Sequence, residues 1–231
     1  MKKVDHQPSK RYLEAKTLVE KNKVYSIEEG MALAKKTSSV KFDASVEAHV
    51  KLGINPKKTD QLVRSSVSLP FGTGKSIRVA AISTNNDQVK AAKAAGAVLA
   101  GDQELIDTIK SGKIEFDALV ATPEAMKLLA PIAKILGPKG LMPNPKDGTV
   151  AANAGEAVAN LMKGKVSYKN DDSGNIHVMI GKVSFKEDEL VENLKAFMSS
   201  LQKAKPTAAK GTFIKSVFLA TSMGPSVKIS V

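Results

Sequence analysis

The sequence contains no cysteine and no tryptophan, and only 4% of its residues are aromatic. The absence of cysteine excludes a disulfide framework and a thiolate metal site. The scarcity of aromatic side chains argues against a broad platform on which nucleic-acid bases could stack. Long apolar runs are also missing, and no apolar signal-peptide segment follows the basic first residues. We therefore expect a cytoplasmic protein without a membrane segment.

Positive charge is what the sequence has in excess. The 231 residues carry a net charge of +12, which indicates a polyanionic partner. The excess is uneven, because residues 70–158 hold 10 basic and 9 acidic side chains, whereas the rest of the chain holds 25 and 14, a net of +11. With few stacking side chains available, contacts to phosphates and to nucleic-acid shape are favoured.

A basic segment opens the chain. A helical pattern is predicted from Ser9, with Tyr12, Leu13, Leu18 and Val19 on one side. Its positive face would either lie on phosphate or be solvated. The basic residues of this segment are Lys2, Lys3, Lys10, Arg11, Lys16, Lys21 and Lys23.

The hydrophobic periodicity changes twice along the chain. A capping box of Ser26 and Glu29 predicts a helix start, and polar–apolar alternation then predicts strands at 44–54 and 61–69. From residue 76 short buried strands alternate with helices, which is typical of a parallel sheet with right-handed crossovers. The central elements predicted are strands 76–83, 97–100 and 118–121 and helices 86–95, 102–111 and 124–136. The later ones are helix 155–163, strands 165–169 and 176–180 around a turn at 170–175, helix 186–203, and strands 213–220 and 227–231.

These patterns predict an α/β protein of two domains. An α+β domain is built from both termini, residues 1–69 and 159–231, with an antiparallel sheet and helices. A Rossmann-like α/β domain with a parallel sheet, residues 70–158, is inserted into it. A single continuous domain remains the alternative on length alone.

A stretch rich in glycine and proline follows the predicted helix 124–136. Residues 135–150 read ILGPKGLMPNPKDGTV, which excludes a continuous helix or a central strand. Because Leu141 and Met142 are apolar, we expect an ordered, rigid connector that packs on the protein, although an ordinary surface loop has a similar composition. The residues assigned to an interdomain connector are Leu69, Pro70, Gly137, Pro138, Gly140, Pro143 and Pro145.

Patterns that suggest an enzyme fail on inspection. Residues 72–76 read GTGKS, like the end of a Walker A loop, but Leu69 stands where that loop needs glycine and a strand is predicted to follow. The histidines His6, His49 and His177 lack metal-ligand spacing. We expect no catalytic residue, no metal site and no cofactor. A nucleotide-dependent enzyme built on the central block remains the alternative function, and a basic DNA-binding regulator is a third class.

Two segments have the composition of an RNA contact. Lys35, Lys36 and Lys41 cluster before the strand that starts near Phe42, whose ring either stacks on a base or sugar or lies in the core. Residues 221–224, Thr-Ser-Met-Gly, offer two hydroxyls, an adaptable thioether and a glycine that permits close backbone approach. This combination suits the shallow minor groove of RNA, with its 2′-hydroxyls. A plain turn between two strands would use the same residues.

The sequence resembles the family of bacterial large-subunit ribosomal proteins called L-one. The stretch at 135–150 carries the resemblance, together with residues 42–50, 67–70 and 221–227. The resemblance implies the same two-domain split, with the two-terminus domain as the RNA binder. It also implies RNA contacts at Phe42, in the Thr-Ser-Met-Gly loop and at nearby strand positions. The RNA-binding candidates are therefore Lys36, Lys41, Phe42, Ser45, Glu47, Lys169, His177, Ser216, Thr221, Ser222, Met223 and Gly224.

The resemblance further implies partners and activities that charge and spacing do not give. The partners are large-subunit rRNA at the mobile stalk of the ribosome, exit-site tRNA, and the mRNA of the protein's own operon. The activities are a structural part in the large subunit, help in releasing tRNA from the exit site, and repression of translation of that mRNA.

Overall fold

The computed structural model describes residues 8–20 and 23–230 of the chain. Two compact units are formed: the first combines Met1–Val63, Leu69–Gly74 and Tyr168–Val231, and the second combines Arg64–Ser68 and Lys75–Ser167. The predicted α/β fold class is confirmed, because an antiparallel sheet and a separate parallel sheet are both present. The domain limits placed at 69/70 and 158/159 stay a prediction that a deletion can test.

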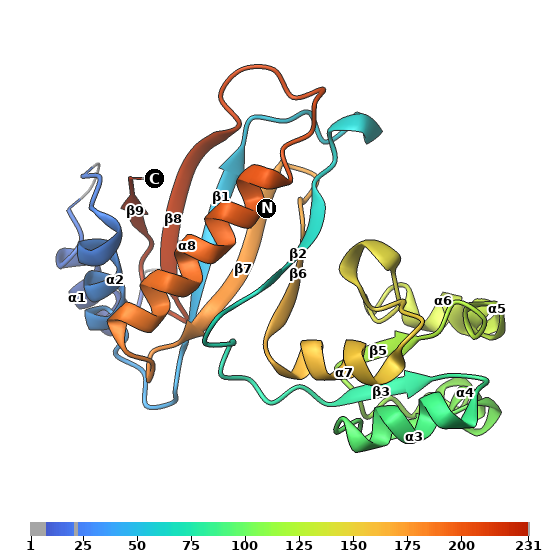
Figure 1. Cartoon of the computed structure of the whole chain (residues 1–231). Helices are drawn as coiled ribbons and strands as arrows, with labels where there is room; N and C mark the ends of the chain where they lie inside the picture. Colours follow the sequence, from blue (N-terminus) through green and yellow to red (C-terminus); the bar gives the residue numbers. More distant parts are fainter. Residues whose placement is uncertain (1–7, 21–22, 231) are drawn as a thin grey trace, which may run out of the picture. The chain divides into compact units, whose positions relative to one another are not determined.

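The sheet of the first unit has four antiparallel strands in the order β7-β1-β8-β9 (Figure 1). Half-buried and buried residues alternate along β1, because successive side chains of a strand point to opposite faces. One face therefore forms a core, and the other carries polar residues. The strands are β1 Ser45–Leu52, β7 Asn175–Lys182, β8 Ile214–Thr221 and β9 Val227–Ile229.

Two amphipathic helices, α2 Ile27–Lys36 and α8 Glu187–Lys203, pack on this sheet and on each other (Figure 1). The predicted capping box starts α2: Glu29 N–H donates to Ser26 Oγ at 3.2 Å, and Ser26 N–H donates to Glu29 Oε2 at 3.3 Å. Met31 of α2 and Phe197 of α8 are fully buried. Both helices thus bury one apolar side, as their sequence periodicity predicts.

The N-terminal helix α1, Lys10–Thr17, begins at the N-cap Ser9 as predicted. Its buried residue is Ala15, whereas Leu13 and Leu18 are exposed. Lys2, Lys3, His6 and Lys21 lie outside the described residues.

The second unit contains the predicted parallel sheet, in the order β4-β3-β5. Every residue of the central strand β3 is buried, which requires helices on both faces. Ala80 and Ile82 belong to one apolar cluster, and Val79 and Ala81 belong to another. The strands are β3 Val79–Ile82, β4 Leu99–Gly101 and β5 Ala118–Ala121, and the longer helices are α3 Asn86–Ala94, α4 Gln103–Lys110 and α7 Ala154–Met162.

Some predicted elements are shorter or broken. The helix expected at 124–136 consists of three pieces around Pro131, which has no N–H to donate: α5 Met126–Leu129, η2 Ala130–Ile132 and α6 Ala133–Leu136. The strand expected at 61–69 begins later, because the 3₁₀ turn η1 Thr59–Gln61 precedes it. It forms β2 Arg64–Ser68, which pairs with β6 Lys165–Lys169.

The Gly/Pro stretch lies within the second unit and is ordered there. Leu141 and Met142 pack against one of its apolar clusters, and Pro143 is buried. The 3₁₀ turn η3, Pro145–Asp147, ends in a carboxylate that pairs with the Arg64 guanidinium, with Nε 3.0 Å from Oδ1. Leu69 and Pro70 lie in the first unit, so the interdomain role of the assigned residues stays a prediction.

Candidate nucleic-acid interface

The structure brings the two predicted RNA segments together, although about 180 residues separate them in the sequence. Ser222 N–H donates to the Ser45 carbonyl at 3.0 Å, and Ser45 N–H donates to Ser222 Oγ at 3.2 Å. These bonds continue the β1–β8 ladder, in which Val46 faces Thr221. We call residues 41–47 and 221–224 the contact surface.

Two large apolar side chains of the contact surface are in solvent. Phe42 is 57% exposed and Met223 is 70% exposed. The alternative that Phe42 lies in the core therefore does not apply. Both side chains therefore leave about half or more of their surface outside the core.

The next residue, Asp43, holds the backbone beside Phe42 in place. The Asp43 carboxylate accepts from Ser184 N–H at 3.1 Å and from Ser184 Oγ at 2.9 Å, and the Asp43 carbonyl accepts from Lys182 Nζ at 3.1 Å. The Ala44 carbonyl accepts from Val183 N–H at 2.9 Å. The backbone that carries Phe42 is thus tied to the end of β7, a link that the sequence did not reveal.

The loop after β8 has an unusual backbone. Met223, and not Gly224, adopts the left-handed conformation, with φ 64°. A residue other than glycine rarely adopts this backbone conformation unless the surrounding structure imposes it. A Cβ on Gly224 would lie 2.3 Å from Thr221 Oγ1, so this glycine is required by the loop itself. Among the described residues, Thr221 Oγ1 is buried without a hydrogen-bond partner.

The four-stranded sheet places four further RNA-binding candidates on one of its faces. Ser45, Glu47, His177 and Ser216 lie at the half-buried or exposed positions that alternate with the buried ones, so they share the outward face. We call this outward side of β1, β7 and β8 the open face. It extends directly from the contact surface.

The lysine candidates divide into three situations. Lys41 is exposed within the contact surface and Lys36 is exposed a few residues before it in sequence, whereas Lys35 donates to the Phe185 carbonyl at 2.6 Å and is held within the fold. Lys169 ends β6, which belongs to the two-stranded sheet and not to the four-stranded one. The structure therefore does not bring Lys169 onto the open face.

Sequence reasoning missed His49 as a site residue. It is the direct cross-strand partner of His177 on the open face, and the two Nδ1 atoms are 2.8 Å apart. Burial, followed by the neighbouring His177, lowers the pKa of His49 below its usual value. Both histidines stand at outward strand positions, but only the strand register shows that they meet.

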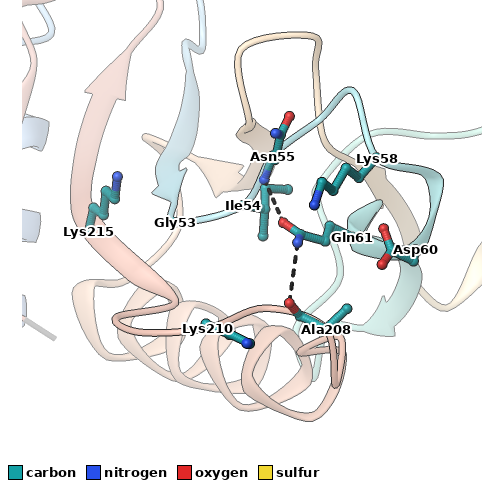
Figure 2. A pocket seen from close by; sticks show the side chains of 9 residues that line it. All are labelled: Gly53, Ile54, Asn55, Lys58, Asp60, Gln61, Ala208, Lys210 and Lys215. Atoms are coloured by element: carbon teal, nitrogen blue, oxygen red, sulfur yellow. Dashed lines mark hydrogen bonds between the residues drawn. The ribbon is translucent and has the colours of Figure 1, made fainter.

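A basic hollow lies at the other end of β1. Figure 2 shows its lining side chains around a cavity of about 600 Å³. Gln61 joins its walls, since Oε1 accepts from Asn55 N–H at 2.8 Å and Nε2 donates to the Ala208 carbonyl at 3.2 Å. Three lysines and one acidic residue line it, so the cavity would attract an anion. The lining residues are Gly53, Ile54, Asn55, Lys58, Asp60, Gln61, Ala208, Lys210 and Lys215.

Other chemistry finds little support in the part of the chain that the structure describes. Residues 72–76 lead into β3 and not into a helix, so they lack the helix N-terminus that holds phosphate in a Walker A loop. Within residues 8–20 and 23–230, no three histidine or acidic side chains are placed to hold a metal ion. No helix in these ranges combines the length and apolar character needed to cross a membrane.

Comparison with known proteins identifies the family of the chain. Residues 34–225 match the model of the ribosomal protein L1p/L10e family. The large ribosomal subunit protein uL1 of Kosmotoga olearia is 48% identical over 221 residues, which cover 96% of this chain and 95% of the relative. The protein of the same name from Laribacter hongkongensis is 47% identical over 221 residues, covering 96% and 94%. The matched span includes both segments of the contact surface, and the chain belongs to the ribosomal protein L1p/L10e family.

Proposed function

We propose that this protein is a constituent of the large ribosomal subunit and binds large-subunit rRNA with the contact surface. The observation that carries the proposal is that exposed Phe42 and Met223 flank neighbouring ends of β1 and β8, which the reciprocal Ser45–Ser222 hydrogen bonds join. The relatives named as large ribosomal subunit proteins support it over the nucleotide-dependent enzyme and the DNA-binding regulator.

The surface supplies two kinds of interaction. Phe42 and Met223 offer a ring and a thioether that pack on bases or sugars, while the Ser222 and Glu47 side chains offer polar groups to 2′-hydroxyls. Exposed Lys36 and Lys41 add positive charge for phosphates. This mixture favours a folded RNA site over a uniform duplex.

The test is truncation of the exposed side chains. We expect Phe42→Ala and Met223→Ala each to weaken binding to a transcript of the rRNA stalk by ~1–3 kcal/mol, the size of a specific contact. Their melting temperatures should change little, because both side chains are mostly in solvent. Filter binding and thermal unfolding measure the two quantities.

Matched controls come from exposed residues elsewhere. Phe71→Ala and Met162→Ala remove side chains that are 45% and 51% exposed but lie outside the contact surface. They should leave RNA affinity unchanged. Equal losses in all four variants would contradict the assignment of the contact surface.

Electrostatics give a second test. If binding neutralises several phosphates, log K should fall with log salt at a slope of about −0.7 to −0.9 for each contact. A salt-independent affinity would overturn the electrostatic part. Equal affinity for a plain RNA duplex of the same length would overturn the shape-specific part.

Two finer activities belong to the same proposal. The contact surface would also bind the mRNA of the protein's own operon, because one surface can accept two RNAs of similar shape. The protein would also contact exit-site tRNA while the rRNA is bound. Operon mRNA should then compete with the rRNA transcript, whereas deacylated tRNA should not. ATP should neither bind nor be hydrolysed.

A further inference from the structure

Two histidines meet in the middle of the open face. His49 on β1 and His177 on β7 are cross-strand partners, with Nδ1 atoms 2.8 Å apart and ring centroids 5.0 Å apart. They are two of the three histidines in the sequence. His177 is one of the RNA-binding candidates, whereas His49 is not among them.

The short distance fixes the protonation of the pair. One Nδ1 must donate a hydrogen and the other must accept it, so at least one ring is neutral while the bond exists. A single extra proton can enter at the Nε2 of the donor ring without breaking that bond. A second proton would place two N–H groups against each other. The pair therefore behaves as one unit that takes up one proton.

The surroundings can stabilise that proton. Glu47 Oε2 lies 3.7 Å from His49 Nε2, and Asp171 Oδ2 lies 3.6 Å from His177 Nε2. Two positively charged side chains oppose the uptake of a proton. They are Lys51 on β1, whose Nζ donates to the Ser173 carbonyl, and Lys228 on β9. Between Lys228 and His49, β8 contributes the uncharged ring of Phe218.

In the protein without RNA, burial keeps the pKa of His49 below its usual value, so this ring is uncharged at neutral pH. Phosphates brought to the open face would add negative charge near both rings. Nearby negative charge favours the protonated form of an imidazole. Binding of RNA and binding of the proton should therefore support each other.

We propose that the His49–His177 pair takes up one proton when RNA binds across the open face, so that RNA affinity rises as the pH falls from 7.5 to 5.5. This inference rests on the proposed RNA binding and adds a proton-linked contact to it. One proton per complex limits the change to about tenfold per pH unit, and we expect about tenfold over the whole interval.

The experiment measures proton uptake directly on the unaltered protein. Binding to the rRNA stalk transcript is followed by calorimetry at pH 6.5 in two buffers of different ionisation enthalpy. The difference in heat gives the number of protons taken up, which we expect to be about half a proton or more. Filter binding at pH 5.5, 6.5 and 7.5 then gives the affinity trend. No uptake together with a flat trend would overturn the inference.

Variants locate the proton. The double variant His49→Gln/His177→Gln should abolish most of the uptake and flatten the pH trend, because it removes both imidazoles of the pair, whereas each single variant leaves one ring and should retain part of the uptake. His6→Gln replaces the third histidine of the sequence and should leave the uptake unchanged. Uptake that persists in the His49→Gln/His177→Gln double variant would place the proton elsewhere and overturn the inference.

Binding that does not depend on pH and a complete absence of binding have different meanings. If the unaltered protein binds the transcript with an affinity that does not depend on pH, the RNA function stands and the proton linkage falls. If the transcript is not bound at any pH, the RNA function itself falls. A circular dichroism spectrum of each variant shows that lost uptake does not reflect unfolding.

Discussion

At the scale of single residues, the loop 221–224 owes its shape to three neighbouring residues. Met223 stands in the left-handed region, which exposes its side chain at the turn, and Gly224 leaves room for the buried Thr221 Oγ1. A non-glycine residue in this region costs of order 1 kcal/mol. Such strain is consistent with a loop whose geometry serves binding.

The packing at Gly224 gives a prediction. Gly224→Ala would place a Cβ 2.3 Å from Thr221 Oγ1, so we expect a loss of ~1–3 kcal/mol in stability through overpacking, together with weaker RNA binding. The double variant Thr221→Ala/Gly224→Ala removes the clashing oxygen and should recover much of the loss. Denaturant unfolding of the parent, Gly224→Ala, Thr221→Ala and the double variant forms a double-mutant cycle.

Gly101→Ala is the control, because its added Cβ would meet its nearest neighbour, Leu105 Cβ, only at 3.8 Å. It should change stability by less than about 0.5 kcal/mol. If Gly224→Ala left stability intact and still weakened RNA binding, the glycine would serve RNA approach and not the loop.

At the scale of elements, the turn between β6 and β7 is organised by one carboxylate. Asp171 Oδ1 accepts from Ser173 N–H at 2.9 Å and from Asn175 N–H at 2.6 Å, and Oδ2 accepts from Asn175 Nδ2 at 3.0 Å. These bonds, led by the one from the Asn175 backbone, lower the pKa of Asp171 to about 2. The turn sets the end of β7 and therefore the position of His177.

The turn predicts an acid-dependent loss of stability. Because the folded-state pKa of Asp171 lies below its usual value of 3.8, its stabilising effect is complete above pH 3.8 and disappears as the pH falls towards 2. Asp171→Asn should destabilise the protein at pH 5 and reduce the further loss between pH 4 and 2. Thermal unfolding across this range measures both effects. Asp172→Asn changes the adjacent carboxylate and should retain the parent's profile; an unchanged profile in Asp171→Asn would refute this account of the turn.

At the scale of the whole molecule, the unit that holds the contact surface is also the more basic one. The first unit carries 22 basic and 14 acidic side chains, a net of +8, and the second carries 13 and 9, a net of +4. The second unit has its own apolar clusters on both faces of its parallel sheet. We infer that RNA binding is a property of the first unit.

A shortened chain tests this inference, and the structure decides where to cut. Asn193 is fully buried; its Oδ1 accepts from Phe71 N–H at 3.1 Å, and its Nδ2 donates to the Gly72 carbonyl at 2.9 Å. A cut directly after residue 68 would leave this amide without those partners. Residues 1–74 should therefore be joined to residues 165–231 through a flexible Gly/Ser linker of roughly ten residues.

We expect the shortened chain to fold and to bind the rRNA transcript with most of the parent's affinity. A cooperative melt followed by circular dichroism shows folding, and filter binding gives the affinity. Any contact with exit-site tRNA that depends on the second unit should be lost. A folded product without affinity for the transcript would move RNA binding to the second unit.

Much of the architecture could be predicted from local sequence, because short-range chemistry specifies it. The capping box of Ser26 and Glu29, the alternation along β1 and the buried run of β3 each follow from side-chain spacing. Pro131 shows the limit of that approach: the apolar period continues through it, but the missing N–H breaks the helix into three pieces. Composition and motif, not periodicity, indicated an RNA partner.

The α/β class, the separation of charge and the two candidate RNA segments follow from the amino-acid sequence, because all three depend on residue type and local period. Three-dimensional folding was needed to show that Phe42 and Met223 are both exposed, that Asp43 anchors one segment, and that His49 meets His177. The physical reason is strand register. A shift of one residue between β1 and its neighbours would turn every side chain to the other face, and that register is set by long-range packing, which no local pattern contains.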